Sequence, residues 1–577
     1  MRPIPHYLAV AGLCLTFGAQ SLAYAEQAAP AKAAKTAKPK KKEVALPKVE
    51  LTSQLLYEFL VAEIAGQRGD LAVASEAYLD LAKTTRDPRI AERATEVAMY
   101  AHQAAAARAA ANIWLDTQPD SLNAQKSLAA LLVNDGKLNE ARPHLEKLIA
   151  AEGGNAGAGF MHLDTLLARQ KDKQAALELV KNLAAPYPNL AEAHFAIAQA
   201  AANAKRYEEA MNEIKTAAKL KPGWELAALF QFQLAGRENA ADGTAFLRDF
   251  LKQYTDAKQV RLIYARQLVS QNQYAAARDE FRQLAKEVPG NPELGMAIGL
   301  LSLQLNDLDG AESAFKAVLA TSSADAGAAQ IYLGQVAELR KQYDQAAKWY
   351  LSVAPGAHYI SAQIRYAGLL AKQGKMAEAR TYLHNLKVDG EADKIQLIEA
   401  EAQLLRETKD YKGVYELLSH ALASRPDSPE LLYDHAMAAE RVNKLDVLEK
   451  DLRHLIRIKP DYAQAYNALG YTLADRTNRL TEAVQLLDHA LKLAPNDAFI
   501  LDSMGWAQYR QGNLDKSLNY LQRAFALRKD PEIAAHLGEV LWAKGNRDEA
   551  QKLWQTALDG SPQNQALLDV MQKFKKP

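Results

Sequence analysis

Residues able to carry enzyme chemistry are present in this 577-residue chain, but few stand at a catalytic spacing. Gly153, Gly154, Gly157 and Gly159 superficially match a dinucleotide-binding loop. His162 occupies the position of the last glycine, and no strand pattern precedes the segment. We therefore expect a flexible loop between two repeats there.

Other catalytic signatures are missing from the sequence. It contains no HExxH zinc pair, no P-loop and no GxSxG nucleophile turn, and the twelve histidines are scattered. We expect most of these histidines to lie on helix surfaces. The prediction is a protein that is not an enzyme, with no catalytic, cofactor-binding or metal site.

A second group of residues suits binding. Towards the C-terminus, aromatic residues alternate with acids at helical spacing: Asp502, Trp506 and Tyr509, then Glu539 and Trp542. Exposed Trp and Tyr flanked by polar groups are typical of interface hot spots. The alternative is that these aromatic rings fill gaps between packed helices. Alanine at Trp506 and Tyr509 distinguishes the two, because only gap-filling predicts a large loss of thermal stability.

A wide apolar face is expected on the first helix of the chain body. Leu55, Leu56, Phe59, Leu60 and Ile64 recur at the spacing of one helix side. No earlier repeat is available to cover this face. The sequence leaves two roles open: docking on a partner, or capping the helix stack against the second unit.

The composition predicts helices almost throughout. Helix-forming residues dominate, aromatic residues make up only 7%, and β-branched runs are scarce. A chain of this length exceeds the usual size of one hydrophobic core, so we expect several domains or a repeat array.

The N-terminus has the pattern of a secretory signal. Arg2 precedes an apolar run over residues 8–17, and Ala23 and Ala25 fit the small-x-small cleavage rule. We expect residues 1–25 to be a signal peptide cleaved after Ala25. The run is too short to span a bilayer. Cys14 is the only cysteine and follows Leu13, so it does not fit a lipidation signal.

A basic tether is predicted over residues 26–49. Residues 26–48 hold seven lysines against Glu26 and Glu43, which gives +5, in an Ala/Lys/Pro-rich stretch. It suits a solubilising spacer, or peripheral contact with the anionic envelope. The formal charge of the whole chain is +1, and Arg2 gives residues 1–25 a charge of +1, so residues 49–577 carry −5. An acidic body argues against nucleic acid as a partner.

A repeat of about 34 residues organises the rest of the chain. Gly470, Gly505 and Gly538 are equivalent, and a small residue follows each by 12 or 13 places. Upstream, Gly299 and Gly334 precede alanines by 12. The small positions of the second helices include Ala210, Ala483 and Ala550. We interpret each unit as two helices that approach closely where the glycine and the alanine face each other.

The turns and ends of the units follow the same pattern. Gly136, Gly374, Gly512 and Gly545 are expected in the turns, where a glycine can adopt positive φ. Proline closes successive units at 34- and 35-residue intervals, at Pro426, Pro460 and Pro495.

This pattern resembles the tetratricopeptide repeat (TPR). The resemblance implies an all-α superhelical solenoid of about 15 helix pairs over residues 50–564, with a capping helix and tail over 565–577. In TPR proteins one stripe of each first helix faces a concave groove. Transferred to the last three units, that stripe comprises Asn467, Tyr471, Asp502, Trp506, Tyr509, Glu539 and Trp542.

Four segments are more specific than a generic repeat. They look like a family of Gram-negative periplasmic or outer-membrane TPR proteins: residues 55–101, which begin LLYEFLVAEIAGQRGD, then NALGYTLADRTNRLTEA from Asn467, ILDSMGWAQYRQG from Ile500 and EIAAHLGEVLWAKG from Glu532. That family includes the lipoprotein adaptor of a carboxyl-terminal processing protease. The resemblance implies a non-catalytic scaffold that delivers substrates such as cell-wall hydrolases to the protease. The alternative is an assembly scaffold for an envelope polysaccharide, pilus or secretion machine.

Overall fold

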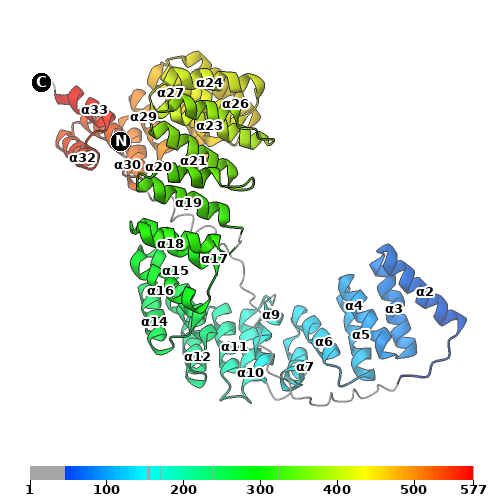
Figure 1. The fold of residues 1–577 in the computed structure, drawn as a ribbon. Coiled ribbons are helices and arrows are strands. Elements are labelled where there is room, and N and C mark those ends of the chain that lie inside the picture. Colours follow the sequence, from blue (N-terminus) through cyan, green and yellow to red (C-terminus); the bar gives the residue numbers. More distant parts are fainter. Residues whose placement is uncertain (1–45, 152–155, 169, 238–239, 322–323, 576–577) are drawn as a thin grey trace. The chain divides into compact units, whose positions relative to one another are not determined.

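The computed structural model describes residues 46–151, 156–168, 170–237, 240–321 and 324–575 (Figure 1). The predicted signal peptide and most of the predicted tether lie outside these residues. Every regular element in the described ranges is an α-helix. These residues form two compact units, one ending at residue 323 and the other beginning at Ala324.

Unit 1 contains the helices α2 to α18. Their bounds are α2 Ser53–Arg68, α3 Leu71–Thr85, α4 Pro88–Tyr100, α5 Ala104–Thr117, α6 Leu122–Asn134, α7 Leu138–Ala151, α8 Ala156–Met161, α9 Leu163–Leu167, α10 Lys173–Ala184, α11 Ala191–Asn203, α12 Tyr207–Leu220, α13 Glu225–Ala235, α14 Ala240–Gln253, α15 Lys258–Ser270, α16 Tyr274–Glu287, α17 Pro292–Gln304 and α18 Leu308–Leu319.

Unit 2 contains the helices α19 to α33. Their bounds are α19 Ala326–Leu339, α20 Tyr343–Leu351, α21 Tyr359–Lys372, α22 Met376–Asn385, α23 Glu391–Glu407, α24 Tyr411–Ser424, α25 Pro429–Arg441, α26 Leu445–Ile458, α27 Ala463–Arg476, α28 Leu480–Leu493, α29 Ala498–Arg510, α30 Leu514–Leu527, α31 Pro531–Ala543, α32 Arg547–Gly560 and α33 Gln565–Lys575.

The helices form consecutive pairs, so each unit is a stack of helix hairpins (Figure 1). If α8 and α9 are taken as one interrupted first helix, the described helices make eight pairs in unit 1 and seven in unit 2, followed by α33. The predicted all-α solenoid of about 15 helix pairs is confirmed.

The local sequence explains where helices begin and end. Pro429 and Pro531 occupy the first turn of α25 and α31, where a missing N–H costs nothing. The Asp497 side chain accepts hydrogen bonds from the first N–H groups of α29. Gly512, with φ 83°, adopts the left-handed conformation in the turn after α29, as predicted. Asn443 does so at the equivalent turn after α25, with φ 59°.

Each repeat glycine makes room for a large side chain of its paired helix. A Cβ at Gly505 would lie 2.6 Å from Leu521 Cγ, and one at Gly470 would lie 2.7 Å from Leu487 Cγ. Gly299, Gly334 and Gly538 would overlap in the same way with Phe315, Tyr350 and Trp554. These partners come four residues, one helical turn, after the small residue of the second helix. The fully buried Ala210, Ala483 and Ala550 occupy that small position.

The described part of the glycine-rich segment differs from expectation, whereas Gly153 and Gly154 lie outside the described residues. Gly157 and Gly159 lie in the short helix α8 instead of a loop. A Cβ at Gly159 would lie 2.8 Å from the Cα of Ile149, so this glycine lets α8 approach α7. Packing explains these glycines without a nucleotide.

Neither a membrane-spanning helix nor a metal-binding cluster is found among the described residues. Among these residues no helix is both long and apolar enough to cross a membrane. Nor do three or more His, Cys, Asp or Glu side chains in these ranges group so as to hold a metal ion.

Candidate partner-binding face

The predicted binding residues lie on first helices that pack directly on one another. Helix α27 contacts α29, α29 contacts α31, and α31 contacts the final helix α33. Side chains on this side of unit 2 therefore form one continuous surface, which we call the first-helix face.

The seven predicted residues differ in exposure. Asp502 and Glu539 are buried, with 7% and 6% of their surface exposed. The other five are half-buried: Asn467, Tyr471, Trp506, Tyr509 and Trp542. A half-buried aromatic ring suits both roles considered from the sequence, because it packs against its neighbours and still presents one edge to solvent.

Trp506 joins three helices. Its indole Nε1 donates a hydrogen bond to Asp475 Oδ1 on α27 at 3.1 Å. Its ring stacks on His536 of α31, with centroids 4.5 Å apart and an interplanar angle of 25°. The Tyr509 ring lies 5.2 Å away on the same helix. Packing and hydrogen bonding therefore hold the indole in one orientation.

His536 is the residue that sequence reasoning missed on this face. Its Nδ1 lies 3.0 Å from both carboxylate oxygens of Asp502, and its side chain is only 19% exposed. Burial opposes charging of the ring, but Asp502, Glu539 and Glu532 together raise the His536 pKa above its ordinary value. His536 is thus an exception to the expectation that most histidines lie on helix surfaces. The available signal was spacing: His536 follows Asp502 by 34 residues, one repeat.

Glu539 and Trp542 connect the face to the end of the solenoid. Glu539 Oε1 accepts from Lys573 Nζ of α33 and lies 3.4 Å from the Tyr509 hydroxyl, which donates to it. The Trp542 ring packs on Phe574 of α33, with centroids 5.3 Å apart. Trp542 therefore belongs to the contact with the final helix.

The structure thus brings Tyr471, Asp502, Trp506 and Glu539 near His536, and Tyr509 packs against Trp506. Tyr471 lies 6.3 Å from the His536 ring, and burial together with nearby carboxylates raises the pKa of its phenol. Asn467 lies one turn earlier on α27, and its side-chain oxygen is buried without a hydrogen-bond partner. Aromatic rings held in place beside carboxylates can bind a peptide.

A second histidine cluster has the outline of a catalytic triad. Ser419 Oγ lies 2.8 Å from His435 Nε2, and His435 Nδ1 lies 2.6 Å from Asp451 Oδ2. Ser419 also donates to the Tyr415 carbonyl at 2.7 Å. Its place in the middle of α24, where backbone N–H groups bond within the helix, leaves no oxyanion donors beside it. His435 and Asp451 are both only 5% exposed. The cluster is therefore a buried hydrogen-bond network that links α24, α25 and α26.

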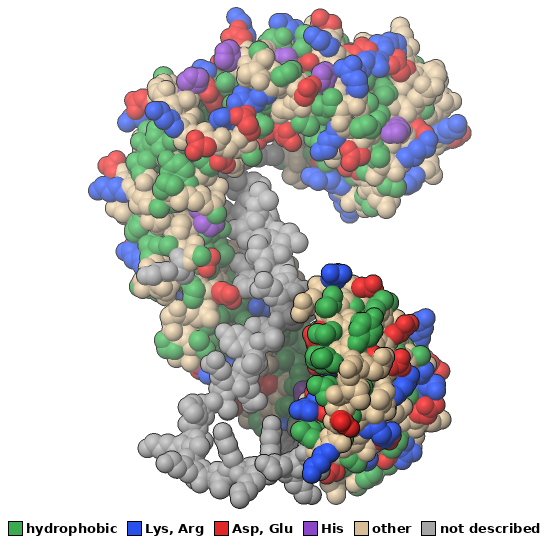
Figure 2. All heavy atoms as spheres, turned by 90° about the vertical axis from the view of Figure 1, so that its right-hand side faces the viewer, with side chains coloured by type: hydrophobic (Ala, Val, Ile, Leu, Met, Phe, Trp, Pro, Cys, Tyr) green, Lys and Arg blue, Asp and Glu red, His purple; other side chains and the backbone are tan. Residues whose placement is uncertain are grey.

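The apolar face of α2 is uncovered in the described part of the chain. Ala62 and Ala65 are buried against α3. Leu56, Phe59, Leu60 and Ile64 are between 41% and 48% exposed. Figure 2 views the molecule from the α2 side and shows hydrophobic side chains gathered there. Helix α2 therefore covers the end of the stack with Leu55, Ala62 and Ala65 and leaves the four apolar side chains exposed in the described residues.

Comparisons with known proteins agree with the helix-pair geometry. Models of the tetratricopeptide repeat match residues 191–223, 296–359, 433–498 and 503–565. The TPR repeat-containing protein PA4667 of Pseudomonas aeruginosa is 34% identical over 484 residues, which cover 84% of this chain and 82% of that protein. The small glutamine-rich tetratricopeptide repeat-containing protein 2 of Mycosarcoma maydis is 26% identical over 19% of this chain and 31% of its own length.

A solved structure resembles part of the chain. The thermophilic TPR protein TTC0263 of Thermus thermophilus is 25% identical, with a TM-score of 0.28, and the match covers 31% of this chain and 95% of that one. The long relative and the repeated family matches together establish the assignment. This chain belongs to the tetratricopeptide-repeat proteins, whose helix pairs serve as scaffolds for protein–protein interaction.

Proposed function

We propose that this protein is an exported, non-catalytic scaffold that binds segments of other proteins on the first-helix face of unit 2. The observation that carries the proposal is the cluster around His536. Trp506, Tyr471 and Tyr509 are held in place, half-exposed, beside Asp475 and Glu539. Rigid aromatic anchors bordered by polar groups are what a protein hot spot requires.

The specific role that we propose is that of a periplasmic adaptor, acting at or near the outer membrane. It would hold a carboxyl-terminal processing protease together with its cell-wall hydrolase substrates. Support for the adaptor role is the sequence resemblance at residues 55–101 and 467–483. Support for export is the apolar run and the Ala-Tyr-Ala site that ends at Ala25. The basic tether would replace the lipid anchor that Cys14 does not provide.

The first test is capture of partners from lightly cross-linked periplasm, read by mass spectrometry. A processing protease recovered in near-stoichiometric amount supports the adaptor role. Protease activity with and without this protein is then the functional readout. If the protease is absent and polysaccharide, pilus or secretion components dominate, the adaptor role is overturned in favour of an assembly scaffold.

Variants connect any captured partner to the face. Trp506→Ala with Tyr509→Ala should reduce capture at least tenfold. Tyr343→Ala with Tyr411→Ala, at exposed starts of two second helices, should leave it unchanged. Glu532→Lys provides a second route, because this side chain is exposed and can be replaced without opening the core. Equal capture by all variants would exclude the first-helix face as the binding surface.

A further inference from the structure

The aromatic character of the first-helix face extends upstream of the His536 cluster. Tyr433 on α25 and Tyr462, directly before α27, have ring centroids 5.8 Å apart. Both are half-buried, as is Tyr471. We call these tyrosines and three neighbouring carboxylates the acidic tyrosine strip. Its members are Tyr433, Tyr462, Tyr471, Glu440, Asp475 and Glu532.

Nearby carboxylates contribute to the electrostatic environment of these rings. The pKa of Tyr471 is raised first by burial and then by Asp475, Asp502, Glu532 and Glu440. Burial, Tyr462, Asp434 and Glu440 raise the pKa of Tyr433. The negative charge of Glu440 raises the pKa of both the Tyr433 and the Tyr471 phenol, so Glu440 lies near both rings.

Four cations that border the strip each have a contact within the chain. Their partners are as follows: Arg406 pairs with Asp434 at 2.5 Å, Arg476 donates to Asn443 Oδ1 at 2.9 Å, Arg510 donates to the Asp475 carbonyl at 2.7 Å, and Lys573 pairs with Glu539. Among the described residues, the carboxylates of Glu440, Asp475 and Glu532 have no ion-pair partner. Arg476 and Arg510 bond neutral oxygen atoms and keep their positive charge. The three carboxylates themselves have no direct ion pair, so each can accept a further cation.

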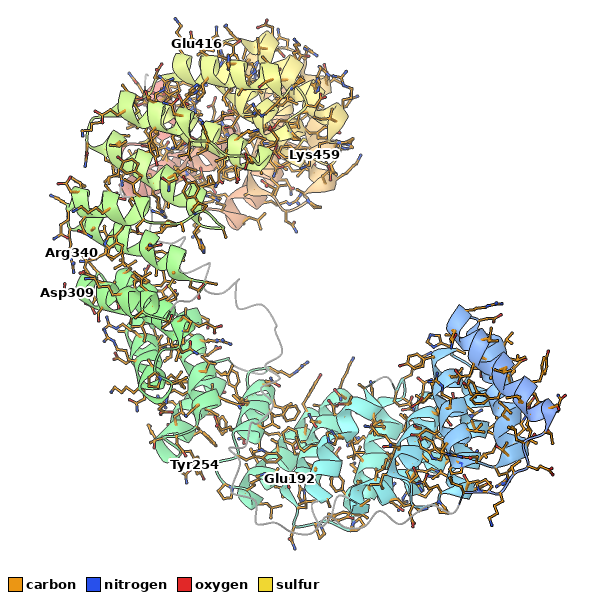
Figure 3. All side chains as sticks on the ribbon, turned by 45° about the vertical axis from the view of Figure 1, so that its right-hand side comes forward. Glu192, Tyr254, Asp309, Arg340, Glu416 and Lys459 are labelled. Carbon is orange, nitrogen blue, oxygen red and sulfur yellow. The ribbon has the colours of Figure 1, made fainter. Side chains whose placement is uncertain are left out.

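One tyrosine of the strip already lies next to a cation. Lys459 Nζ lies 5.2 Å from the centroid of the Tyr462 ring. Figure 3 labels Lys459 on unit 2. An ammonium group at this distance is attracted by the negative face of the ring. The Tyr433 and Tyr471 rings have no such cation over them among the described residues, although they lie in the same acidic surroundings.

We propose that the acidic tyrosine strip binds an extended segment that carries lysine or arginine side chains, supplied by a partner protein. Each cation would lie over a tyrosine ring and beside an unpaired carboxylate, so that cation–π attraction and charge complementarity act together. The inference rests on the proposed function, because it names the partner chemistry of that face.

Geometry gives the length of the segment. Neighbouring helices pack about 8–10 Å apart, so α25, α27, α29 and α31 extend over roughly 24–30 Å. An extended chain advances about 3.3 Å per residue, so roughly eight or nine residues cover the strip.

The test uses the full chain and a defined probe. A fluorescently labelled 12-residue peptide of alternating Lys and Ala is titrated with the protein, and binding is read by anisotropy. A matching Glu/Ala peptide is the charge control. The strip variant is Glu440→Gln with Asp475→Asn and Glu532→Gln. The amide oxygen that Asp475→Asn introduces can still accept the hydrogen bond from Trp506.

A matched variant removes three charges elsewhere in unit 2. It carries Glu416→Gln, Asp488→Asn and Glu549→Gln, all exposed on the second helices α24, α28 and α32. Glu416 lies on the outside of unit 2 (Figure 3). We expect the strip variant to weaken binding of the Lys/Ala peptide at least tenfold and the matched variant to change it less than twofold. Raising salt from 0.05 to 0.5 M should also weaken it strongly, because exposed charges are screened.

Three results would overturn the inference: equal loss in the matched variant, equal binding of the Glu/Ala peptide, or no saturable binding of the Lys/Ala peptide. The experiments distinguish failure of this inference from failure of the proposed function. If the peptide fails while the Trp506 and Tyr509 variants still lose captured proteins, the scaffold role stands with a different ligand chemistry. If the peptide binds but no protein is captured, the proposed function fails by itself.

Discussion

His435 shows how one side chain can tie three helices together. It reaches Ser419 on α24 with one ring nitrogen and Asp451 on α26 with the other. Its ring also stacks on Tyr415, with centroids 4.8 Å apart. A buried polar group is stable only while its partners are present. The cluster therefore stabilises unit 2 because each buried polar group in it has a hydrogen-bond partner.

Removal of the His435 side chain should lower the free energy of unfolding. His435→Ala leaves the Asp451 carboxylate buried without its partner, which we expect to cost about 3 kcal/mol. Urea unfolding followed by circular dichroism measures the shift in midpoint. His454→Ala is the control, because His454 pairs with the exposed Asp427 and such pairs contribute about 0–1 kcal/mol. Equal shifts in both variants would contradict a structural role for the cluster.

The His536 site predicts a pH-dependent stability. Because Asp502 and its neighbours raise the folded-state pKa of His536, protonation favours the folded protein. The contribution is fully present below the unfolded value of about 6.5 and is lost as pH rises through the raised value. Thermal melts of wild type and His536→Gln across pH 5.5–9 should show a difference that shrinks with rising pH. A difference that stays constant would refute the Asp502–His536 linkage.

At the scale of the element, close packing of paired helices depends on a glycine opposite a bulky residue. Trp554 is the largest fully buried side chain, and it occupies the space beside Gly538. Its Nε1 donates to the Ala535 carbonyl at 3.2 Å, which fixes the ring in place. The helix pair therefore cannot accept a larger residue at 538 without moving the indole.

Gly538→Ala should consequently destabilise the last helix pair. The expected cost is about 1–3 kcal/mol, the usual range for overpacking a filled core. Gly368→Ala is the matched control, since this glycine is also inside a first helix but has open space where the Cβ would stand. There the gain in helix propensity should leave stability unchanged or raise it by about 1 kcal/mol. Chemical denaturation of both variants tests the comparison, and a neutral Gly538→Ala would show that the indole relocates freely.

For the whole molecule, the two units offer a test of modularity. Repeat proteins gain stability from contacts between neighbouring pairs, so each unit carries its own packed clusters. In unit 2 these include a cluster that runs from Leu432 to Ala507 and another that runs from Leu521 to Val570. Residues 324–577 expressed alone should be helical and unfold cooperatively. A fragment without a cooperative melt would show that unit 2 requires unit 1 in order to fold.

The sequence by itself determined the repeat and its helices. Small residues at Gly470, Gly505 and Gly538, and prolines near the helix ends, act locally or through the adjacent helix of the same hairpin. Their spacing is therefore visible in one dimension. The candidate face could also be predicted from the sequence, because a repeat places equivalent residues on equivalent sides of successive first helices.

Only the tertiary structure decided the roles of individual side chains. Trp542 and Trp506 occupy equivalent stripes in sequence, yet one packs on α33 and the other joins Asp475 to His536. His435 and His536 acquire their partners from residues 16 and 34 positions away. Burial and pairing of this kind depend on which side chains of neighbouring helices meet, and no local pattern records that. The physical reason is that the repeat determines on which side of a helix a residue lies. The burial and the partners of its side chain depend on contacts with the neighbouring repeats.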